Sequence, residues 1–378
     1  MIKTWSYAEE YKKNRSKILK TIDKTLASGN LFFGKQLDTF EKNFIKQNKA
    51  KYGVAVGSGT DALIIALKAL GIGNNKKDEV ITVANTAIPT ASAIISAGAK
   101  PVFVDIGNDY LMDLTKIKKL INKNSKAIIP VHLYGHSCNM EELMKIAKKY
   151  KLKIIEDCAQ AQGATFKNKH VGTFGDFGCF SFYPTKILGT YGDGGFIITK
   201  KFDNYKKIKR LRFYGIETTD KKNKFFNKYY ANESGFNSRI DEIQCSILNI
   251  KLKYLDNFIK RRIQLANLYA YNLRNTKLKL PIINDSSKHV YHLFTVSHPS
   301  KNKITKLLKK NKIETRVIYP YPINKMHVYK KFNSKKNDLK NTEKKSKEIF
   351  SLPLYPELKI SEVNQICKTL GKILKKID

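Results

Sequence analysis

The sequence predicts an α/β protein: a large domain on a mostly parallel sheet over residues 1–245, followed by a smaller α+β domain over residues 246–378. Short apolar runs alternate with helical segments through the first half of the chain, which is the order of strands and crossover helices in parallel sheets. These runs are almost continuously apolar, as in strands covered on both faces. A long helical stripe of apolar residues over 241–271 then leads into mixed helix and strand patterns.

The chain is strongly basic, with 71 Lys and Arg against 32 Asp and Glu and a formal net charge of +39. The cations are nearly all lysines spread along the whole chain, without an aromatic RNA-binding signature or a zinc finger. We therefore interpret them as a solvated surface that attracts anionic partners weakly, with no specific nucleic-acid partner. A regulatory or nucleic-acid-binding protein is the alternative from a different class.

The start of the chain has no apolar signal core, and no later stretch approaches a membrane-spanning run. We expect a cytoplasmic protein without a membrane partner. The five cysteines are scattered and lack Cys-x-x-Cys spacing, so neither a disulfide framework nor a metal site is expected.

Residues 8–50 have the apolar spacing of two amphipathic helices with a break at 28–30. The first strand is expected over 52–56 and runs into the turn Gly57-Ser58-Gly59 and an alanine-rich helix. Strand, glycine turn and helix together aim free backbone N–H groups and the positive end of a helix dipole at an anion. This pattern favours a phosphate cradle, although it matches neither standard nucleotide motif. A glycine turn with a Ser/Thr cap is the alternative.

Polar residues follow several of the later expected strands, which lie at residues 79–83, 100–104, 127–131, 152–155, 178–182 and 195–199. Ligands of such sheets bind at the carboxyl ends of strands, and that rule selects Asp105, His132 and the pair Glu156-Asp157. For Asp105 and His132, a cap or a satisfied polar group is an equal alternative. Asp157 ends a buried strand among small residues, where a carboxylate needs a cationic partner. A protonated pyridine nitrogen would serve, and Gln160 could donate to a neighbouring ring oxygen.

Lys186 lies between the aromatic run Phe180–Tyr183 and the glycine cluster Gly192–Gly195. Desolvation by the aromatic rings would lower the pKa of its amine, as attack on a carbonyl requires. An ordinary loop lysine is the alternative. The phosphate cradle, Asp157 and Lys186 are together the three requirements of a pyridoxal phosphate site: an anion clamp, an acid for the ring nitrogen and a reactive amine.

Four stretches carry a family resemblance: Gly57–Leu63, Glu156–Ala161, Ser181–Lys186 with Gly192–Gly195, and Gly235–Arg239. Together they resemble the DegT/DnrJ/StrS family of pyridoxal phosphate-dependent aminotransferases, which act on nucleotide-linked keto sugars. The resemblance runs from about Trp5 to Leu358. It implies the type I fold of the aspartate aminotransferases and a homodimer with shared active sites.

The resemblance also implies a role for each matched residue. Lys186 bonds the cofactor covalently and then moves a proton between a cofactor carbon and a sugar carbon. Asp157 pairs with the pyridinium nitrogen, and Gln160 lies near the ring hydroxyl. Family dehydratases carry histidine in place of the lysine, so Lys186 argues against dehydration.

The phosphate is expected to be bound by three residues of one subunit and one from a second: Gly59, Thr60, Ser181 and, across the interface, Asn237. Tyr183 and Arg239 are expected to bind substrate. For Arg239, a surface ion pair is an equal alternative.

The loop over 84–90 and the stretch over 289–293 look more like members that aminate carbon 3 of dTDP-linked 6-deoxy sugars than those that aminate carbon 4. We therefore expect amino transfer, with glutamate as donor, to a nucleotide-linked 3-keto-6-deoxyhexose; the same chemistry at carbon 4 is the alternative. Three positions depart from the pattern. Ala87 replaces an aromatic ring that stacks on the pyridine in many relatives, and Ile318 and Asn324 replace histidines near the sugar, so the hexose stays open.

Overall fold

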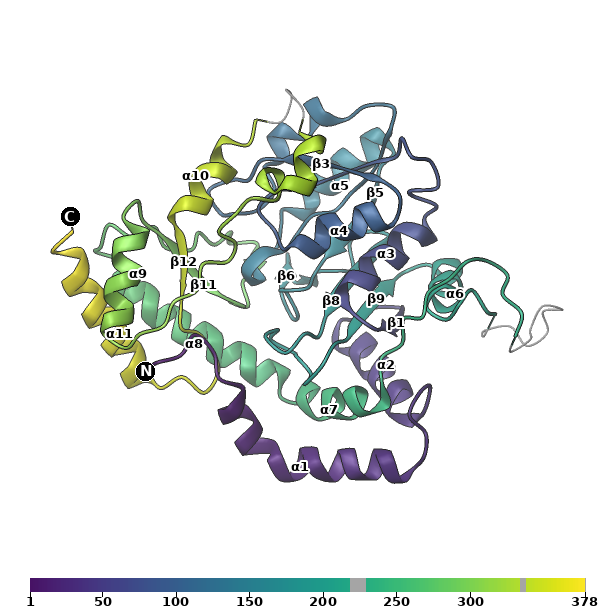
Figure 1. Ribbon diagram of the computed structural model, residues 1–378, viewed down its shortest axis with the longest axis horizontal. Coiled ribbons are helices and arrows are strands. Elements are labelled where there is room, and N and C mark those ends of the chain that lie inside the picture. The colour runs from purple at the N-terminus through teal and green to yellow at the C-terminus, as the bar shows by residue number, and fades with distance from the viewer. Residues whose placement is uncertain (218–228, 334–337, 378) are drawn as a thin grey trace.

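A seven-stranded sheet forms the centre of the large region, with helices on both faces (Figure 1). The computed structural model describes residues 1–217, 229–333 and 338–377. The strand order is β1-β9-β8-β5-β4-β2-β3, in which β9 runs antiparallel to both neighbours and the other pairs are parallel. The strands are β1 (Tyr52–Val56), β2 (Glu79–Val83), β3 (Lys100–Val104), β4 (Ser125–Ile128), β5 (Lys153–Asp157), β8 (Phe177–Ser181) and β9 (Gly195–Thr199). The expected α/β class with a mostly parallel mixed sheet is confirmed.

Both faces of this sheet are buried, because alternate residues of each strand enter different cores. Val54 and Val56 pack on one side, with Ile155, whereas Ala55 and Ile154 pack on the other. The helices on the first side are α3 (Gly59–Ala69), α4 (Ile88–Ser96) and α6 (Phe202–Leu211), and those on the second are α2 (Lys35–Gln47) and α5 (Met140–Tyr150). The near-continuous apolar strands seen in the sequence follow from this two-sided burial.

The expected strand over 127–131 is shorter and earlier in the structure, where β4 ends at Ile128. Pro130 follows and has no N–H to donate to a strand ladder, which explains the early end. Its carbonyl nevertheless accepts a hydrogen bond from the Asp157 amide (2.9 Å), and this bond keeps the segment beside β5.

The expected long helix over 241–271 is two helices, α7 (Glu242–Leu252) and α8 (Leu255–Leu273). The prediction of one continuous helix is wrong because the apolar stripe changes phase: Ile250 and Leu252 are two residues apart and so point to different sides of a helix. The chain turns between Leu252 and Leu255, where the Tyr254 amide donates a hydrogen bond to the Lys251 carbonyl (2.9 Å). Helix α7 lies beside α1 (Tyr7–Ala27), and α8 leads away toward the C-terminal helices (Figure 1).

A second core joins the C-terminal part of α8 with a two-stranded sheet and two helices. Its elements are β11 (Phe294–Ser297), β12 (Ile349–Leu352), α9 (Lys301–Lys310) and α11 (Ile360–Leu374). Ile2 belongs to the same core: it forms a parallel bridge with Ile313, donates to the Lys312 carbonyl (2.8 Å) and accepts from the Glu314 amide (2.9 Å). We keep the division into two domains, residues 1–245 and 246–378, as a proposal. Helix α8 contributes its first turns to a core of the large sheet and its last turns to the second core.

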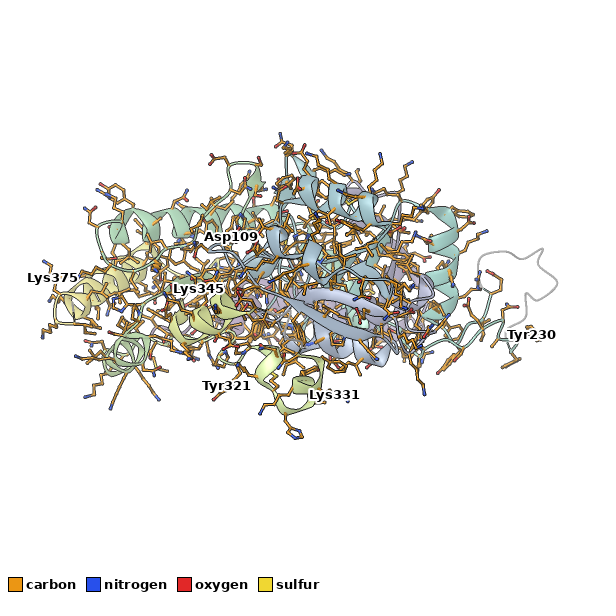
Figure 2. All side chains as sticks on the ribbon, turned by 90° about the horizontal axis from the view of Figure 1, so that it is seen from above. Asp109, Tyr230, Tyr321, Lys331, Lys345 and Lys375 are labelled. Atoms are coloured by element: carbon orange, nitrogen blue, oxygen red, sulfur yellow. The ribbon has the colours of Figure 1, made fainter. Side chains whose placement is uncertain are left out.

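The remaining elements are short: β6 (Thr165–Phe166), β7 (Lys169–His170) and β10 (Ser287–Lys288) form a small sheet, and α10 (Lys340–Glu348) precedes β12. Five 3-10 turns lie at Leu114–Lys116, Lys118–Leu120, Leu133–Gly135, Ile323–Lys325 and His327–Phe332. Lys375 and Tyr230 lie at opposite ends of the long axis (Figure 2). Within the described ranges, no helix is both long and apolar enough to cross a membrane.

Candidate active site

The start of α3 forms the cradle that the glycine turn predicts. Ser58 is the N-cap, and its hydroxyl accepts a hydrogen bond from the Asp61 amide (3.1 Å). The first amides of a helix have no partner within the helix. In the part of the chain that the structure describes, the amides of Gly59 and Thr60 make no hydrogen bond. Two N–H donors and the positive end of the helix dipole are therefore available to an anion.

Ser181 lies against the start of α3 because Gly59 has no side chain. A Cβ at Gly59 would lie 2.7 Å from the Ser181 Cβ, and one at Gly195 would lie 2.2 Å from the Ser58 carbonyl oxygen. Both distances are shorter than side-chain contacts allow. The glycines thus bring the end of β8 and the start of β9 against the cradle.

Ser238 is a cradle residue that the sequence analysis missed. Its hydroxyl donates to Asp61 Oδ2 (2.7 Å) and accepts from the Gly57 amide (3.0 Å). It therefore fixes the segment over 237–239 beside the glycine turn of the same chain. The only sequence signal was its place between Asn237 and Arg239 in a stretch already singled out.

The other three residues of the predicted phosphate and substrate set lie toward the surface. Asn237 is exposed and forms an antiparallel bridge with Phe213. The Arg239 guanidinium lies 4.4 Å from the ring centre of Phe32, a cation–π contact rather than the surface ion pair considered above. The Tyr183 side chain is 52% exposed. None of the three is held inside the cradle of its own chain by a hydrogen bond of its side chain within the described residues.

Asp157 is a buried carboxylate without an ion-pair partner among the described residues. Oδ2 accepts from the Thr90 hydroxyl (2.8 Å), and Oδ1 accepts from the Ala159 amide (3.1 Å). Burial raises the pKa of this carboxyl, against the lowering effect of these hydrogen bonds and of the Lys186 charge. A cation placed next to Asp157 would offset that desolvation.

Gln160 is held by both ends of its amide. Oε1 accepts from the Tyr134 amide (2.8 Å), and Nε2 donates to the Tyr319 hydroxyl (2.9 Å). Burial, with the Asp157 charge second, raises the pKa of Tyr319, so this hydroxyl stays protonated. Tyr134 and Tyr319 were not predicted, because they come from segments far from Gln160 in sequence.

Lys186 lies in the turn after β8, where its amide donates to the Tyr183 carbonyl (2.9 Å). Burial lowers the pKa of its amine to about 8, although the Asp157 charge acts in the opposite direction. The expected depression of the pKa is present, but two of the expected rings point elsewhere. Phe180 and Phe182 pack edge to face on Phe44 of α2, with ring centres 5.1 and 5.2 Å apart.

Glu156 is structural, in contrast to its neighbour Asp157. Its carboxylate accepts from the amides of Gly172 (2.7 Å), Phe174 and Gly175 (both 2.8 Å) and contacts His132 Nε2 (3.2 Å). His132 Nδ1 accepts from a backbone amide (3.1 Å), so the proton is on Nε2 and is donated to Glu156. Ligand atoms of His132, Glu156 and Cys158 lie within 4.8 Å of one another, but these hydrogen bonds occupy the Glu156 carboxylate and both ring nitrogens of His132, which a metal would need.

Asp105 is also structural, so the capping alternative applies to it. Its carboxylate accepts from the Thr342 amide (2.7 Å), the Thr342 hydroxyl (2.7 Å) and the Asn341 amide (3.1 Å) at the start of α10. Lys116 completes the group with a 2.8 Å ion pair. Of the strand-end residues, Asp157 alone keeps a role at the candidate site.

These residues fit pyridoxal phosphate. The cradle offers free amides to a phosphate, Asp157 lacks a cation, and the Lys186 amine is easily deprotonated. Nδ1 of His292, whose pKa is lowered by burial and then by the Lys186 charge, is buried without a hydrogen-bond partner within the described residues. An unpaired buried polar atom is costly, and a polar ligand beside Lys186 would offset that cost.

The DegT/DnrJ/EryC1/StrS aminotransferase family model matches residues 12–371. The chain belongs to this family. As in the rest of the family, its cofactor is pyridoxal phosphate, and the protein is a sugar aminotransferase. The resemblance predicted from four short stretches is confirmed over nearly the whole chain.

Three relatives illustrate the match. The dTDP-3-amino-3,4,6-trideoxy-alpha-D-glucose transaminase of Micromonospora megalomicea subsp. nigra is 38% identical over 98% of both chains. The structure of DesV from S. venezuelae with a ketimine intermediate has a TM-score of 0.94 at 32% identity, covering 100% of this chain and 99% of that one. The structure of NtdA from Bacillus subtilis with bound cofactor PMP has a TM-score of 0.88 at 32% identity, covering 96% of this chain and 82% of that one.

Proposed function

We propose that this family member converts a nucleotide-linked 3-keto-6-deoxyhexose, with dTDP as the nucleotide, to the 3-amino-3,6-dideoxyhexose, with glutamate as amino donor. The observation that carries the proposal is that the Lys186 amine, whose pKa burial lowers to about 8, and the buried carboxylate of Asp157 are close enough for the charge of each to act on the other. The transaminase from Micromonospora, named for a dTDP-3-amino sugar, supports the choice of carbon 3 and of dTDP.

Each residue of the site has a separate role toward the cofactor. Pyridoxal phosphate, when bound, supplies an electron sink that stabilises negative charge on the carbon next to the reacting nitrogen. Asp157 keeps the ring nitrogen protonated, and Thr90 and the Ala159 amide orient that carboxylate. The amides of Gly59 and Thr60, with the Ser181 hydroxyl, bind the phosphate. Gln160 is oriented toward the ring hydroxyl by Tyr134 and Tyr319.

Nζ of Lys186 moves the protons. In the first half-reaction the neutral amine would take the proton from the α-carbon of glutamate; the amino nitrogen would stay with the bound cofactor, and water would supply the carbonyl oxygen of the departing 2-oxoglutarate. In the second, the protonated amine of Lys186 supplies a proton to carbon 3 of the sugar. A pKa near 8 suits both directions, since both protonation states are populated near neutral pH.

We also propose a homodimer whose active sites are shared. Asn237 is exposed on its own chain, beside the cradle that Ser238 fixes. Phe32 and Phe33 are 44% and 41% exposed; Phe32 lies against Arg239, and Phe33 lies against Arg212. A second copy would cover these rings and let its Asn237 complete the phosphate site. Tyr183 and Arg239 would then face the substrate, and we keep the cytoplasmic location as part of this proposal.

The reverse reaction tests the position of amination. The aldehyde form of the enzyme would be mixed separately with dTDP-3-amino- and dTDP-4-amino-6-deoxyhexoses while its visible absorption band is followed. Loss of the band with the 3-amino sugars alone is the expected result. Loss with the 4-amino sugars alone would establish the carbon 4 alternative, and no change with either would show that the nucleotide, the sugar or the proposed reaction is wrong.

A further inference from the structure

Two adjoining hollows lie at the edge of the sheet opposite the cradle. The larger, of about 800 Å³, is lined by α2, the junction of α7 with α8, and the small sheet; the smaller, of about 270 Å³, lies between the start of β1 and the end of β9. They share Lys49 and His170. We call them together the lysine groove, since eight lysines line it: Lys46, Lys49, Lys51, Lys169, Lys200, Lys253, Lys260 and Lys288.

The lysine groove has a large excess of positive charge. Asp256 is its one acidic lining residue, and it accepts a hydrogen bond from Gln47 (3.2 Å). Within the described ranges, none of the eight lysines has a carboxylate within ion-pairing distance. By contrast, a few surface lysines outside the groove, such as Lys167 with Glu141 (2.6 Å), are paired. The groove thus keeps its cations unneutralised.

His170 lines both hollows, and its pKa is affected by the positive charge of the groove. Its pKa is lowered by burial first, and then by the charges of Lys49 and Lys288. Its Nδ1 atom is buried and has no hydrogen-bond partner among the described residues. Lys49 lies in the turn after α2 and Lys288 lies in β10, so their charges reach this ring from two different elements rather than from one helix.

The groove is separate from the candidate active site. Strand β1 begins at Tyr52, directly after Lys51, and its other end runs into the cradle at Gly57. Five residues of strand at about 3.3 Å each place the two sites roughly 16 Å apart through the sheet. A ligand of the groove would therefore not compete with the cofactor or the sugar.

We propose that the lysine groove binds an inorganic oligophosphate, such as pyrophosphate or tripolyphosphate. Several closely spaced negative charges match several unpaired ammonium groups, and Lys binds phosphate as a point charge. Asn43, Thr165 and Thr173 add uncharged polar groups to the walls. The lining includes no Phe, Tyr or Trp, and His170 is its one aromatic ring, so it offers little surface on which bases could stack; this favours an inorganic ligand over a nucleotide or nucleic acid.

The test is calorimetric titration of the holoenzyme with tripolyphosphate at a fixed salt concentration near 0.15 M, because weak surface attraction is screened there. The site variant Lys49→Glu/Lys288→Glu is compared with the control variant Lys76→Glu/Lys77→Glu. The control changes the net charge equally, at two exposed lysines of the turn before β2. Circular dichroism and thermal unfolding of both variants without ligand would check that each is folded.

We expect one tripolyphosphate per chain for the unmodified protein, an affinity at least tenfold weaker in the site variant, and an unchanged affinity in the control. Equal losses in both variants would overturn the proposal, because the general charge of the protein would then account for binding. Absence of saturable binding, or tighter binding of a single-stranded oligonucleotide that the site variant loses, would overturn it as well. If the site variant does not fold, the single variant Lys288→Gln would replace it in the titration. This variant keeps the charge of Lys49, and it should still bind tripolyphosphate more weakly than the unmodified protein.

Discussion

The hydroxyl of Thr90 donates a 2.8 Å hydrogen bond to Oδ2 of Asp157, which joins the helix after β2 to the end of β5. Thr86 lies 3.1 Å from the same hydroxyl, so the loop after β2 is linked to the carboxylate through two threonines. A carboxylate held from two sides cannot rotate away from a ring nitrogen placed before it. Orientation of Asp157 is therefore built into the protein before the cofactor binds.

Replacement of Asp157 by Asn should lower kcat by at least about 100-fold, the scale on which lost electrostatic stabilisation acts. The amide cannot keep the ring nitrogen protonated, yet it can still accept from the Ala159 amide, so the fold should persist. Steady-state kinetics and circular dichroism would measure both effects. Full activity of a folded Asp157→Asn enzyme would contradict the assigned role.

Replacement of Glu156 by Gln, one residue earlier, should instead lower the free energy of unfolding by about 2–4 kcal/mol. Either orientation of the amide would aim its N–H₂ at backbone amides that now donate to a carboxylate. Urea denaturation would measure the loss. If Glu156→Gln were as stable as the unmodified protein, the carboxylate would not be the anchor of the turn over 172–175.

Uptake of pyridoxal phosphate by the cofactor-free protein should accelerate with pH, with a midpoint near 8. Only the neutral amine of Lys186 attacks a carbonyl; at a pKa of 8, roughly a tenth of it is neutral at pH 7, far more than for an unperturbed lysine. Stopped-flow absorbance from pH 6 to 10 would record the profile. A midpoint near 10.5 would show that burial does not perturb this amine.

Replacement of Lys186 by Ala is the matched control for that profile. The variant should develop no absorption band from bond formation at any pH and should have no measurable turnover. Because burying a cationic amine is unfavourable below its pKa, the cofactor-free variant should be no less stable than the parent at pH 7. Retained amination by Lys186→Ala would overturn the enzymatic assignment of this residue.

Replacement of Gly59 by Ala should weaken pyridoxal phosphate binding by about tenfold or more, because it displaces the cradle. A tenfold loss of affinity corresponds to roughly 1.4 kcal/mol of binding free energy. The new Cβ would collide with Ser181 at 2.7 Å. Gly371→Ala in α11 is the control, because nothing lies within 4 Å of its Cβ. It should stabilise the protein by about 0.5–1 kcal/mol and leave cofactor affinity unchanged. Equal affinities in the two variants would contradict the cradle assignment.

The sequence predicted most of the sheet because burial on both faces leaves a strong local signal. The expected strands over 52–56, 79–83, 100–104 and 195–199 have these bounds in the structure. Lys186 and Asp157 could be predicted as well, since each stands in a chemical context where its residue type is otherwise costly. The split of α7 from α8 was missed because a phase shift of the apolar stripe was interpreted as one continuous helix.

Supporting residues of the site could not be predicted from local pattern. Ser238, Thr90 and Tyr319 acquire their roles from contacts across long stretches of chain. Serine, threonine and tyrosine are common in loops, so nothing in their own surroundings distinguishes these three. The same holds for Asp105, whose position after a strand suits a ligand site but whose partner proves to be the start of α10.

The second residue of the chain, Ile2, is part of the core formed by α8, α9, α11 and the β11–β12 pair. During synthesis, this residue has no place to pack until Ile313 and most of α11 have been made. Its pairing with Ile313 joins two positions that are 311 residues apart in the sequence, a contact whose entropic cost is met only late in folding. The C-terminal core should therefore be the last to consolidate on the ribosome.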